Sequence, residues 1–251
     1  MITRKSREQI ALMRKAGKVV AEMHEVCIRA AKPGATTADV DQAARDVLDR
    51  RGARSNFLGY GSPPFPGVVC TSPNEVIVHG IPSKKVVLEE GDILSIDCGA
   101  IIEGWHADAA VTVPVGEIDD ESKRLLEVTR ASLEAAIEHV TASDRLGDIG
   151  AAVEGVAERA GFSVVREYVG HGIGTAMHEE PQIPNYGPPG RGLRLKEGMV
   201  LAVEPMVNAG GAATELLADG WTVVTKDRRR SAHFEHTIAV AANGPEVLTL
   251  P

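Results

Sequence analysis

The chain has 251 residues, of which 43% are hydrophobic, and its formal net charge at pH 7 is −8. This length accommodates one large domain or two small ones, and the acidic balance argues against a general DNA-binding protein, which is usually basic. No apolar run approaches the ~20 residues that span a bilayer, and the charged N-terminal segment lacks the apolar region of a signal peptide. Three cysteines are too few for a disulfide framework. We therefore expect a cytoplasmic protein without DNA or membrane partners.

The first fifty residues predict two helices. A Ser-x-x-Gln capping box and apolar residues at helical spacing predict a helix over residues 7–31. Thr37 or Asp39 then caps a second helix, which ends at Gly52. The Gly- and Pro-rich residues 53–67 predict a loop, and its aromatic side chains indicate that it lines a site.

A ten-residue pattern occurs twice in the chain. Residues 88–97 and 195–204 each contain a charged turn closed by glycine, then an apolar β-run, and then a carboxylate in the last position. These carboxylates are Asp97 and Glu204. Because an unpaired carboxylate in a buried strand costs free energy, its recurrence indicates two equivalent strands that supply ligands to one shared site.

The first copy continues as a predicted hairpin over residues 92–115, with its turn at Glu103-Gly104. If the turn centres there, Asp97 and Asp108 are diagonal neighbours across the pair of strands. A centre one residue earlier sets them directly opposite each other. In both registers the two acids lie on the same face of the sheet.

The second half repeats the order of the first. Its predicted elements are helices over 120–140 and 149–160 and strands over 163–169, 221–225 and 232–241. Because helices and a carboxylate-bearing strand recur, we predict an internally duplicated fold. We expect one α+β domain over residues 1–251, with pseudo-two-fold halves of roughly 6–116 and 120–245 and an antiparallel sheet covered by helices.

Five residues are candidate metal ligands. Four acids lie in or beside apolar strands and one histidine lies between glycines: Asp97, Asp108, His171, Glu204 and Glu235. Converging carboxylates repel one another without cations, and two divalent ions balance a charge of about −4 better than one does. Oxygen-rich ligation with one imidazole suits Mn, Fe, Co or Zn. Two such ions ~3.5–4 Å apart would hold a hydroxide nucleophile and polarise a carbonyl, so metal-assisted hydrolysis is the predicted reaction class.

Simpler interpretations compete with these assignments. A lone acid at a strand end is more often a turn or cap residue; the repeat argues against this for Asp97 and Glu204, whereas Glu235 by itself stays undecided. The histidine-glutamate stretch that begins at His178 is not a zincin motif, because Gln182 stands where a second histidine is required. The remaining histidines are assigned to the surface or to packing: His24, His106, His139, His233 and His236.

Three groups of segments show a family resemblance. They are Asn74-Glu75-Val76 with His79-Gly80-Ile81-Pro82, Gly170-His171-Gly172-Ile173-Gly174 with His178-Glu179-Glu180-Pro181, and Glu204-Pro205-Met206 with Glu235-His236-Thr237. Together they resemble type I methionine aminopeptidase, and the similarity covers essentially the whole chain. The resemblance implies the "pita-bread" fold and removal of the initiator methionine from nascent polypeptides.

The resemblance also implies a role for each matching residue. The implied ligands of two divalent ions are Asp97, Asp108, His171, Glu204 and Glu235. Asp108 and Glu235 would bridge the ions, and Glu204 would also transfer protons. His79 would lie near the scissile amide, and His178 would hydrogen-bond the substrate carbonyl as it becomes an oxyanion. The implied methionine pocket consists of Tyr60, Phe65, Cys70, His79, Met177 and Trp221, whose sulfur and aromatic groups suit a thioether.

Two departures from the family concern this pocket. Met177 stands where many relatives have an aromatic residue, and the loop over residues 59–66 is longer than in some relatives. The resemblance further implies a monomer and a preference for small second residues. Ribosome association fits the implied function, although no segment of the sequence argues for it.

Two alternatives remain open at this point. One is a prolidase or Xaa-Pro aminopeptidase on the same fold; the short chain argues against it, and the segment around His79 matches the methionine enzymes better. The other is a non-catalytic relative that binds protein or RNA. Such a protein is expected to have lost metal ligands, and all five are present here.

Overall fold

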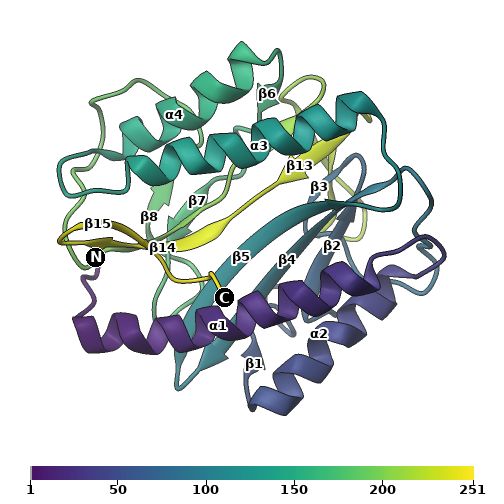
Figure 1. The fold of residues 1–251 in the computed structure, drawn as a ribbon, viewed down its shortest axis with the longest axis horizontal. Helices are drawn as coiled ribbons and strands as arrows, with labels where there is room; N and C mark the ends of the chain where they lie inside the picture. The colour runs from purple at the N-terminus through teal and green to yellow at the C-terminus, as the bar shows by residue number, and fades with distance from the viewer. Residues whose placement is uncertain (1) are drawn as a thin grey trace.

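In residues 2–251, the part of the chain that the computed structural model describes, four helices cover one face of the antiparallel strands (Figure 1). The helices are α1 (Arg7–Ala30), α2 (Thr37–Arg51), α3 (Asp120–Glu138) and α4 (Leu146–Arg159). The strands are β1 (Arg54–Ser55), β2 (Val69–Pro73), β3 (Val76–Val78), β4 (Ile93–Ile102), β5 (Trp105–Pro114), β6 (Ser163–Val164), β7 (Gly170–Gly172), β8 (Glu179–Ile183), β9 (Val200–Val203), β10 (Met206–Asn208), β11 (Thr214–Leu216), β12 (Val223–Thr225), β13 (Ser231–His233), β14 (His236–Ala241) and β15 (Gly244–Val247). The α+β class predicted from the sequence is confirmed.

The first two helices begin at capping boxes, as their sequences predict. Ser6 caps α1, and its side chain accepts a hydrogen bond from the Gln9 amide. The cap of α2 is Thr36, so the prediction of Thr37 or Asp39 was wrong by one residue or more. Thr36 has extended backbone and accepts from the Asp39 amide, while the Asp39 carboxylate accepts from the Thr36 amide at 2.7 Å. Asp39 is therefore the third helical residue of the box.

The hairpin of β4 and β5 has the first of the two predicted registers. Glu103 and Gly104 both have positive φ in the turn, so Asp97 pairs with Ala110 and Gly99 pairs with Asp108. The two acids are diagonal neighbours on one face. The opposite face packs against α1 and α2 through apolar residues that include Val20, Met23, Val40, Val47, Leu94, Ile96 and Cys98.

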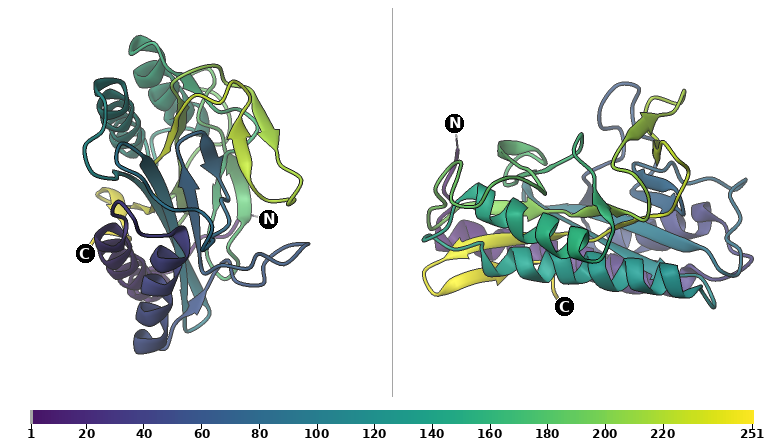
Figure 2. Two further views of the ribbon diagram at one scale, coloured as in Figure 1. Left: turned by 90° about the vertical axis from the view of Figure 1, so that its right-hand side faces the viewer. Right: turned by 90° about the horizontal axis from the view of Figure 1, so that it is seen from above.

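The second half forms a five-stranded sheet in the order β15-β14-β9-β7-β8. Its apolar face packs against α3 and α4 through residues that include Leu125, Leu133, Ile149, Val153, Leu201 and Ile238. Figure 2 shows all four helices on the same side of the strands, with the β11–β12 hairpin and the loop after β1 projecting from the other side. Both sheets therefore turn their helix-free faces toward one region.

The strand predicted over residues 232–241 is interrupted at Phe234 and Glu235, so Glu235 lies between two strands and not within one. Phe234 and Glu235 lie between β13, which pairs with β10, and β14, which pairs with β9. The partner strands are interrupted at the matching place, at Glu204-Pro205. Proline has no amide hydrogen to donate to a ladder. Both acids therefore lie where the chain passes from one sheet to the next.

Four other predictions of element boundaries or loops were wrong. The strand predicted over 163–169 ends at Val164, because the following residues turn so that Tyr168 packs edge-on against His79. The strand predicted from Trp221 begins at Val223, since the Asp219 carboxylate accepts from the Trp221 and Thr222 amides and holds a turn there. Helix α4 begins at Leu146, three residues earlier than predicted, and the loop predicted over 53–67 contains the short strand β1.

The two halves are joined along β5. The Ala110 amide donates to the Glu235 carbonyl at 3.3 Å, and the Glu235 amide donates to the Ala110 carbonyl at 2.9 Å. Two residues away, the Thr237 hydroxyl accepts from the Asp108 amide and donates to the Asp108 carbonyl. Within residues 2–251 every helix is too short or too polar to cross a lipid bilayer.

Candidate active site

A cavity of about 250 Å³ opens on the helix-free side of the strands. It is lined by Phe57, Tyr60, Phe65, Cys70, His79, Asp97, Asp108, His171, Met177, His178, Glu204, Trp221 and Glu235. Every residue that the sequence assigns to the site lies in this lining, and Phe57 is added to them. Residues far apart in the sequence thus meet at one place.

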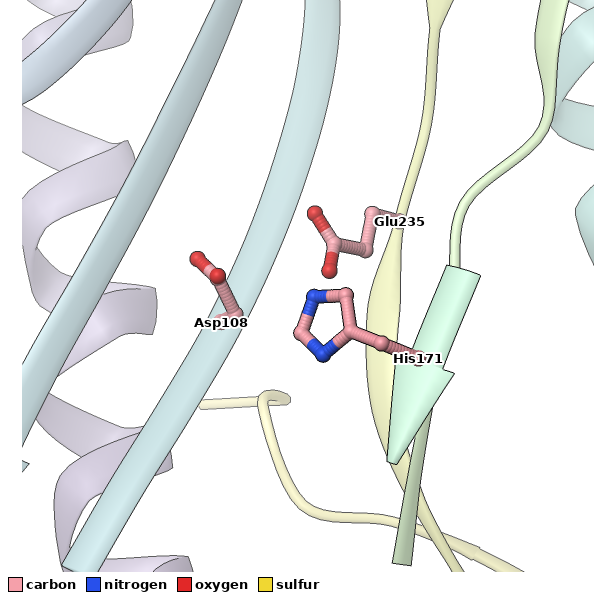
Figure 3. A group of neighbouring side chains, drawn as sticks. All are labelled: Asp108, His171 and Glu235. Carbon is pink, nitrogen blue, oxygen red and sulfur yellow. The ribbon is translucent and has the colours of Figure 1, made fainter. Parts of the chain in front are cut away.

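Three of the candidate ligands meet most closely. Each of Asp108, His171 and Glu235 offers one donor atom, and these atoms lie within 4.8 Å of one another. Figure 3 shows them converging from β5, from β7 and from the interruption between β13 and β14. The Glu204 Oε1 atom is 3.6 Å from His171 Nε2. Asp97 lines the same cavity from β4.

Strand register accounts for this convergence. Asp97 and Ala110 are paired on neighbouring strands, and directly paired residues share a face. Ala110 bonds in turn to Glu235. On the other side His171 pairs with Ala202, which is two residues before Glu204 and therefore on the same face.

Asp108 and Glu235 are buried, Asp97 and Glu204 are partly buried, and all four carboxylates line the same cavity. Burial raises the pKa of Asp97 to about 7. Burial and the neighbouring acids raise the pKa values of Asp108, Glu204 and Glu235 well above their usual range. One oxygen each of Asp97, Asp108 and Glu235 is buried without a hydrogen-bond partner, and in the described chain no lysine or arginine lines the cavity. A set of buried oxygens beside an imidazole fits divalent cations.

His171 is oriented to offer its second nitrogen to the cavity. Its Nδ1 atom lies 2.9 Å from the Gly172 carbonyl, so Nδ1 bears the hydrogen and Nε2 is left with a lone pair. Burial, and the charge of nearby His178, lower the pKa of His171 to about 4. A neutral imidazole that is fixed by a backbone carbonyl is the usual state of a metal-ligating histidine.

Two further histidines line the cavity. The Tyr60 hydroxyl lies 2.7 Å from Nδ1 of His178, and burial lowers the pKa of His178. His79 has positive φ and packs edge-on against Trp221. Burial, followed by the charge of His178, lowers the pKa of His79 to about 4. Both shifts favour the neutral form of the imidazole.

The rest of the cavity is an apolar compartment. Phe57, Phe65, Cys70 and Met177 pack together in it, with Trp221 against them. The Trp221 indole donates to the Pro63 carbonyl at 2.8 Å. This hydrogen bond fixes the loop after β1 beside this end of the cavity. Cys70 pairs with Asp97 across β2 and β4, and burial followed by the charge of Asp97 raises the pKa of its thiol. The thiol is therefore neutral and acts as a soft apolar group.

His233 is a neighbour of the site, although its sequence context predicted a surface or packing residue. Its buried Nε2 atom lies 3.9 Å from Glu204 Oε2 and 4.0 Å from Glu235 Oε2. It also lines a smaller cavity of about 110 Å³, together with His79, Tyr168 and Met206 among others. The predicted strand over residues 232–241 contained a signal for this neighbour, because residues 233 and 235 would share a face in a continuous strand. The linings of both cavities lack His24, His106, His139 and His236.

Comparisons with known proteins agree with this geometry. Residues 11–242 match metallopeptidase family M24. The chain is 50% identical over 250 residues to the methionine aminopeptidase of Clostridium acetobutylicum, covering 100% of this chain and 99% of that protein. It is 50% identical over 249 residues to methionine aminopeptidase 1 of Bacillus subtilis, covering 99% of each.

Solved structures show the same likeness. The crystal structure of methionine aminopeptidase from Thermotoga maritima is 45% identical, with a TM-score of 0.97 and coverage of 100% of both chains. The prolidase of Pyrococcus horikoshii is 22% identical, with a TM-score of 0.77, and covers 98% of this chain and 63% of its own; that likeness concerns the fold alone. The family resemblance and the pita-bread fold stated from the sequence are confirmed. The chain belongs to metallopeptidase family M24, and it is a metal-dependent hydrolase.

Proposed function

We propose that this enzyme hydrolyses the N-terminal methionine from nascent polypeptides, as one catalytic domain over residues 1–251 with halves of roughly 6–116 and 120–245. One observation supports this most directly: a cluster of carboxylates and histidines shares a cavity with a small compartment of sulfur and aromatic groups. The first part suits hydrolysis of an amide, and the second suits the methionine side chain. The names of the similar proteins reported above agree.

The proposed metal ligands are Asp97, Asp108, His171, Glu204 and Glu235. They would hold two divalent ions of Co, Mn, Fe or Zn, which would supply Lewis acidity toward the peptide carbonyl and lower the pKa of the attacking water. Two ions match the four carboxylate charges, whereas one would leave a net charge of about −2 buried. Asp108 and Glu235 are the proposed bridging residues.

The chain's own side chains would manage the protons. Glu204 lines the cavity with its Oε1 atom 3.6 Å from His171 Nε2, so its carboxylate would lie beside the attacking water and receive its proton. The Tyr60 hydroxyl can donate to Nδ1 of His178, which places the imidazole hydrogen on Nε2. That N–H would donate to the substrate carbonyl oxygen as negative charge develops on it.

The methionine side chain would occupy the apolar compartment. Tyr60, Phe65, Cys70, His79, Met177 and Trp221 would surround it. Their soft sulfur atoms and aromatic faces suit a thioether, and the Trp221–Pro63 hydrogen bond fixes the loop beside them. Met177 offers a flexible chain where many relatives have a ring, so we expect this pocket to adapt its shape to the guest. His79 would lie beside the scissile amide.

The proposed partner is the N-terminal segment of a nascent protein, met in the cytoplasm by a monomeric enzyme. Ribosome association would bring the enzyme to such chains as they emerge. We expect no DNA partner, because the net charge is −8.

The test is release of free amino acid from Met-Ala-Ser and from Ala-Pro-Ala by metal-stripped protein, with Mn²⁺ or Co²⁺ added back. We expect metal-dependent release of methionine from the first peptide alone. Cleavage of the second peptide instead would move the enzyme to the proline-specific branch of the family. Release from neither peptide would reject both activities and favour a non-catalytic, protein-binding role.

A further inference from the structure

The segment that precedes α1 lies against the loop that contains the two site histidines. Lys5 is a buried lysine, 8% exposed. Its Nζ atom lies 2.7 Å from Glu179 Oε2 and donates to the Thr3 hydroxyl oxygen at 2.7 Å. The Thr3 hydroxyl in turn donates to the same Glu179 oxygen at 2.7 Å. A lysine is almost never buried unless it is paired.

Glu179 connects this ion pair to His178. Its second oxygen, Oε1, accepts from the Thr175 amide at 2.9 Å and from the Ala176 amide at 3.4 Å. The carboxylate thus closes the turn of residues 174–178, which ends at His178. Glu179 itself follows His178 directly, so a displacement of one moves the other.

Contacts at Gly174 and at the Lys5 amide show how closely the N-terminal segment packs against its neighbours. A Cβ atom added at Gly174 would lie 2.5 Å from Lys5 Cε and 2.5 Å from Glu179 Oε1, so a larger residue there would displace the side chains of the ion pair. The Gly174 carbonyl accepts from the His106 amide at 2.9 Å, which ties the turn to β5. The Lys5 amide donates to the Gly198 carbonyl at 2.6 Å, just before β9. Lys5 therefore lies where the histidine loop, β5 and β9 meet.

We propose that Lys5 and Glu179 are positioning residues, whose buried ion pair fixes the turn over residues 174–178 and so holds His178 in the cavity. A buried ion pair gives little net stability relative to an apolar contact, because desolvation offsets the attraction. Its value here is geometric, since it allows a single arrangement of a turn that begins with the small residues Gly174, Thr175 and Ala176. The catalytic consequence rests on the proposed function, in which His178 contacts the substrate carbonyl.

The experiment compares full-length Lys5→Met with wild type, both loaded with Mn²⁺, by steady-state kinetics on Met-Ala-Ser and by hydrogen–deuterium exchange of the 173–180 peptide. The matched control is Lys15→Met. Lys15 forms an ion pair with Glu103 at 2.8 Å, but both side chains are more than half exposed. The Lys15→Met substitution therefore removes a positive charge from the same N-terminal region, but at an exposed ion pair away from the site.

In Lys5→Met we expect kcat to fall about tenfold or more, because small displacements of a catalytic group cost one to two powers of ten. KM and bound metal should stay close to wild type, and exchange over 173–180 should become faster. Lys5→Arg keeps a charged donor and should restore most of kcat. Lys15→Met should match wild type in all measurements.

Unchanged exchange in Lys5→Met would show that the ion pair does not fix the turn. Faster exchange with an unchanged kcat would show that the turn does not matter for His178. If Lys5→Met fails to fold, Thr3→Val removes one hydrogen-bond donor to Glu179 at an exposed position. This variant should show a smaller fall in kcat and a smaller increase in exchange over 173–180. If wild type itself releases no methionine, the proposed function fails, while exchange still decides whether Lys5 fixes the turn.

Discussion

The backbones of Ala110 and Glu235 hydrogen-bond to each other in both directions, at 3.3 and 2.9 Å, and this pair joins the two halves of the molecule at the site. Ala110 also pairs with Asp97 on the other side. A carboxylate from each half is therefore placed one strand away from the same alanine. The cluster of acids depends on this junction as much as on either repeat.

Replacing Asp108 with alanine should abolish peptide hydrolysis. Asp108 is buried within the cluster, and its substitution removes one proposed bridging ligand. Loss even of residues that only orient metal ligands costs about 10–100-fold, so we expect a loss of activity beyond about 100-fold. Circular dichroism should show an unchanged fold, and elemental analysis should show less bound metal. Full activity in this variant would refute the proposed ligand set.

Replacing His178 with alanine should lower turnover without loss of metal. The histidine is assigned to the substrate carbonyl, and removal of one oxyanion donor typically costs about 10²–10³-fold in kcat. Steady-state kinetics on Met-Ala-Ser and metal analysis of the same sample measure the two effects separately. A fall in bound metal would instead place His178 among the ligands.

Replacing Tyr60 with phenylalanine should reduce kcat more mildly than loss of His178 does. The hydroxyl lies 2.7 Å from His178 Nδ1 and is its only hydrogen-bond partner among the described residues. A hydrogen bond of this type contributes about 1 kcal/mol, so we expect about a fivefold fall in kcat. The matched control is Tyr186→Phe, since the Tyr186 hydroxyl donates to the Arg166 carbonyl outside the cavity. Equal kinetics in the two variants would contradict the tautomer assigned to His178.

His24 should make folding stability depend on pH. Burial, and then the charge of His236, lower its pKa to about 4 from a usual value of 6.5. Between these values the unfolded state binds the proton and the folded state does not, so the free energy of unfolding falls as pH falls from about 6.5 to about 4. The expected decrease in the free energy of unfolding is about 3 kcal/mol, because a difference of one pKa unit corresponds to about 1.36 kcal/mol.

The measurement for His24 is urea unfolding of wild type and His24→Asn at several pH values. The difference between the two proteins isolates this histidine from the other buried ones. The variant should lose less stability than wild type as pH falls from 6.5 to about 4. A parallel loss in both proteins would mean that His24 is charged in the folded state.

Local patterns in the sequence predicted the main helices, the β4–β5 hairpin and the first candidate ligands. The capping box at Ser6, the period-two alternation of β4 and the turn at Glu103-Gly104 each depend on residues close in the chain, so their predictions were confirmed. The same alternation placed Asp97 and Asp108 on one face without any tertiary information. The repeat then identified Glu204 as the counterpart of Asp97, and both line the cavity.

Contacts between distant segments decided the rest. The interruption at Glu235 follows from pairing of β13 and β14 with two different strands, and no local pattern contains that choice. The proximity of His233 to Glu204 and the ion pair of Lys5 with Glu179 likewise join segments far apart in the chain. The sequence by itself determined which residues are capable of the chemistry, because periodicity and residue type are local. Only the tertiary structure decided which of them meet, because burial and strand pairing are properties of the whole chain.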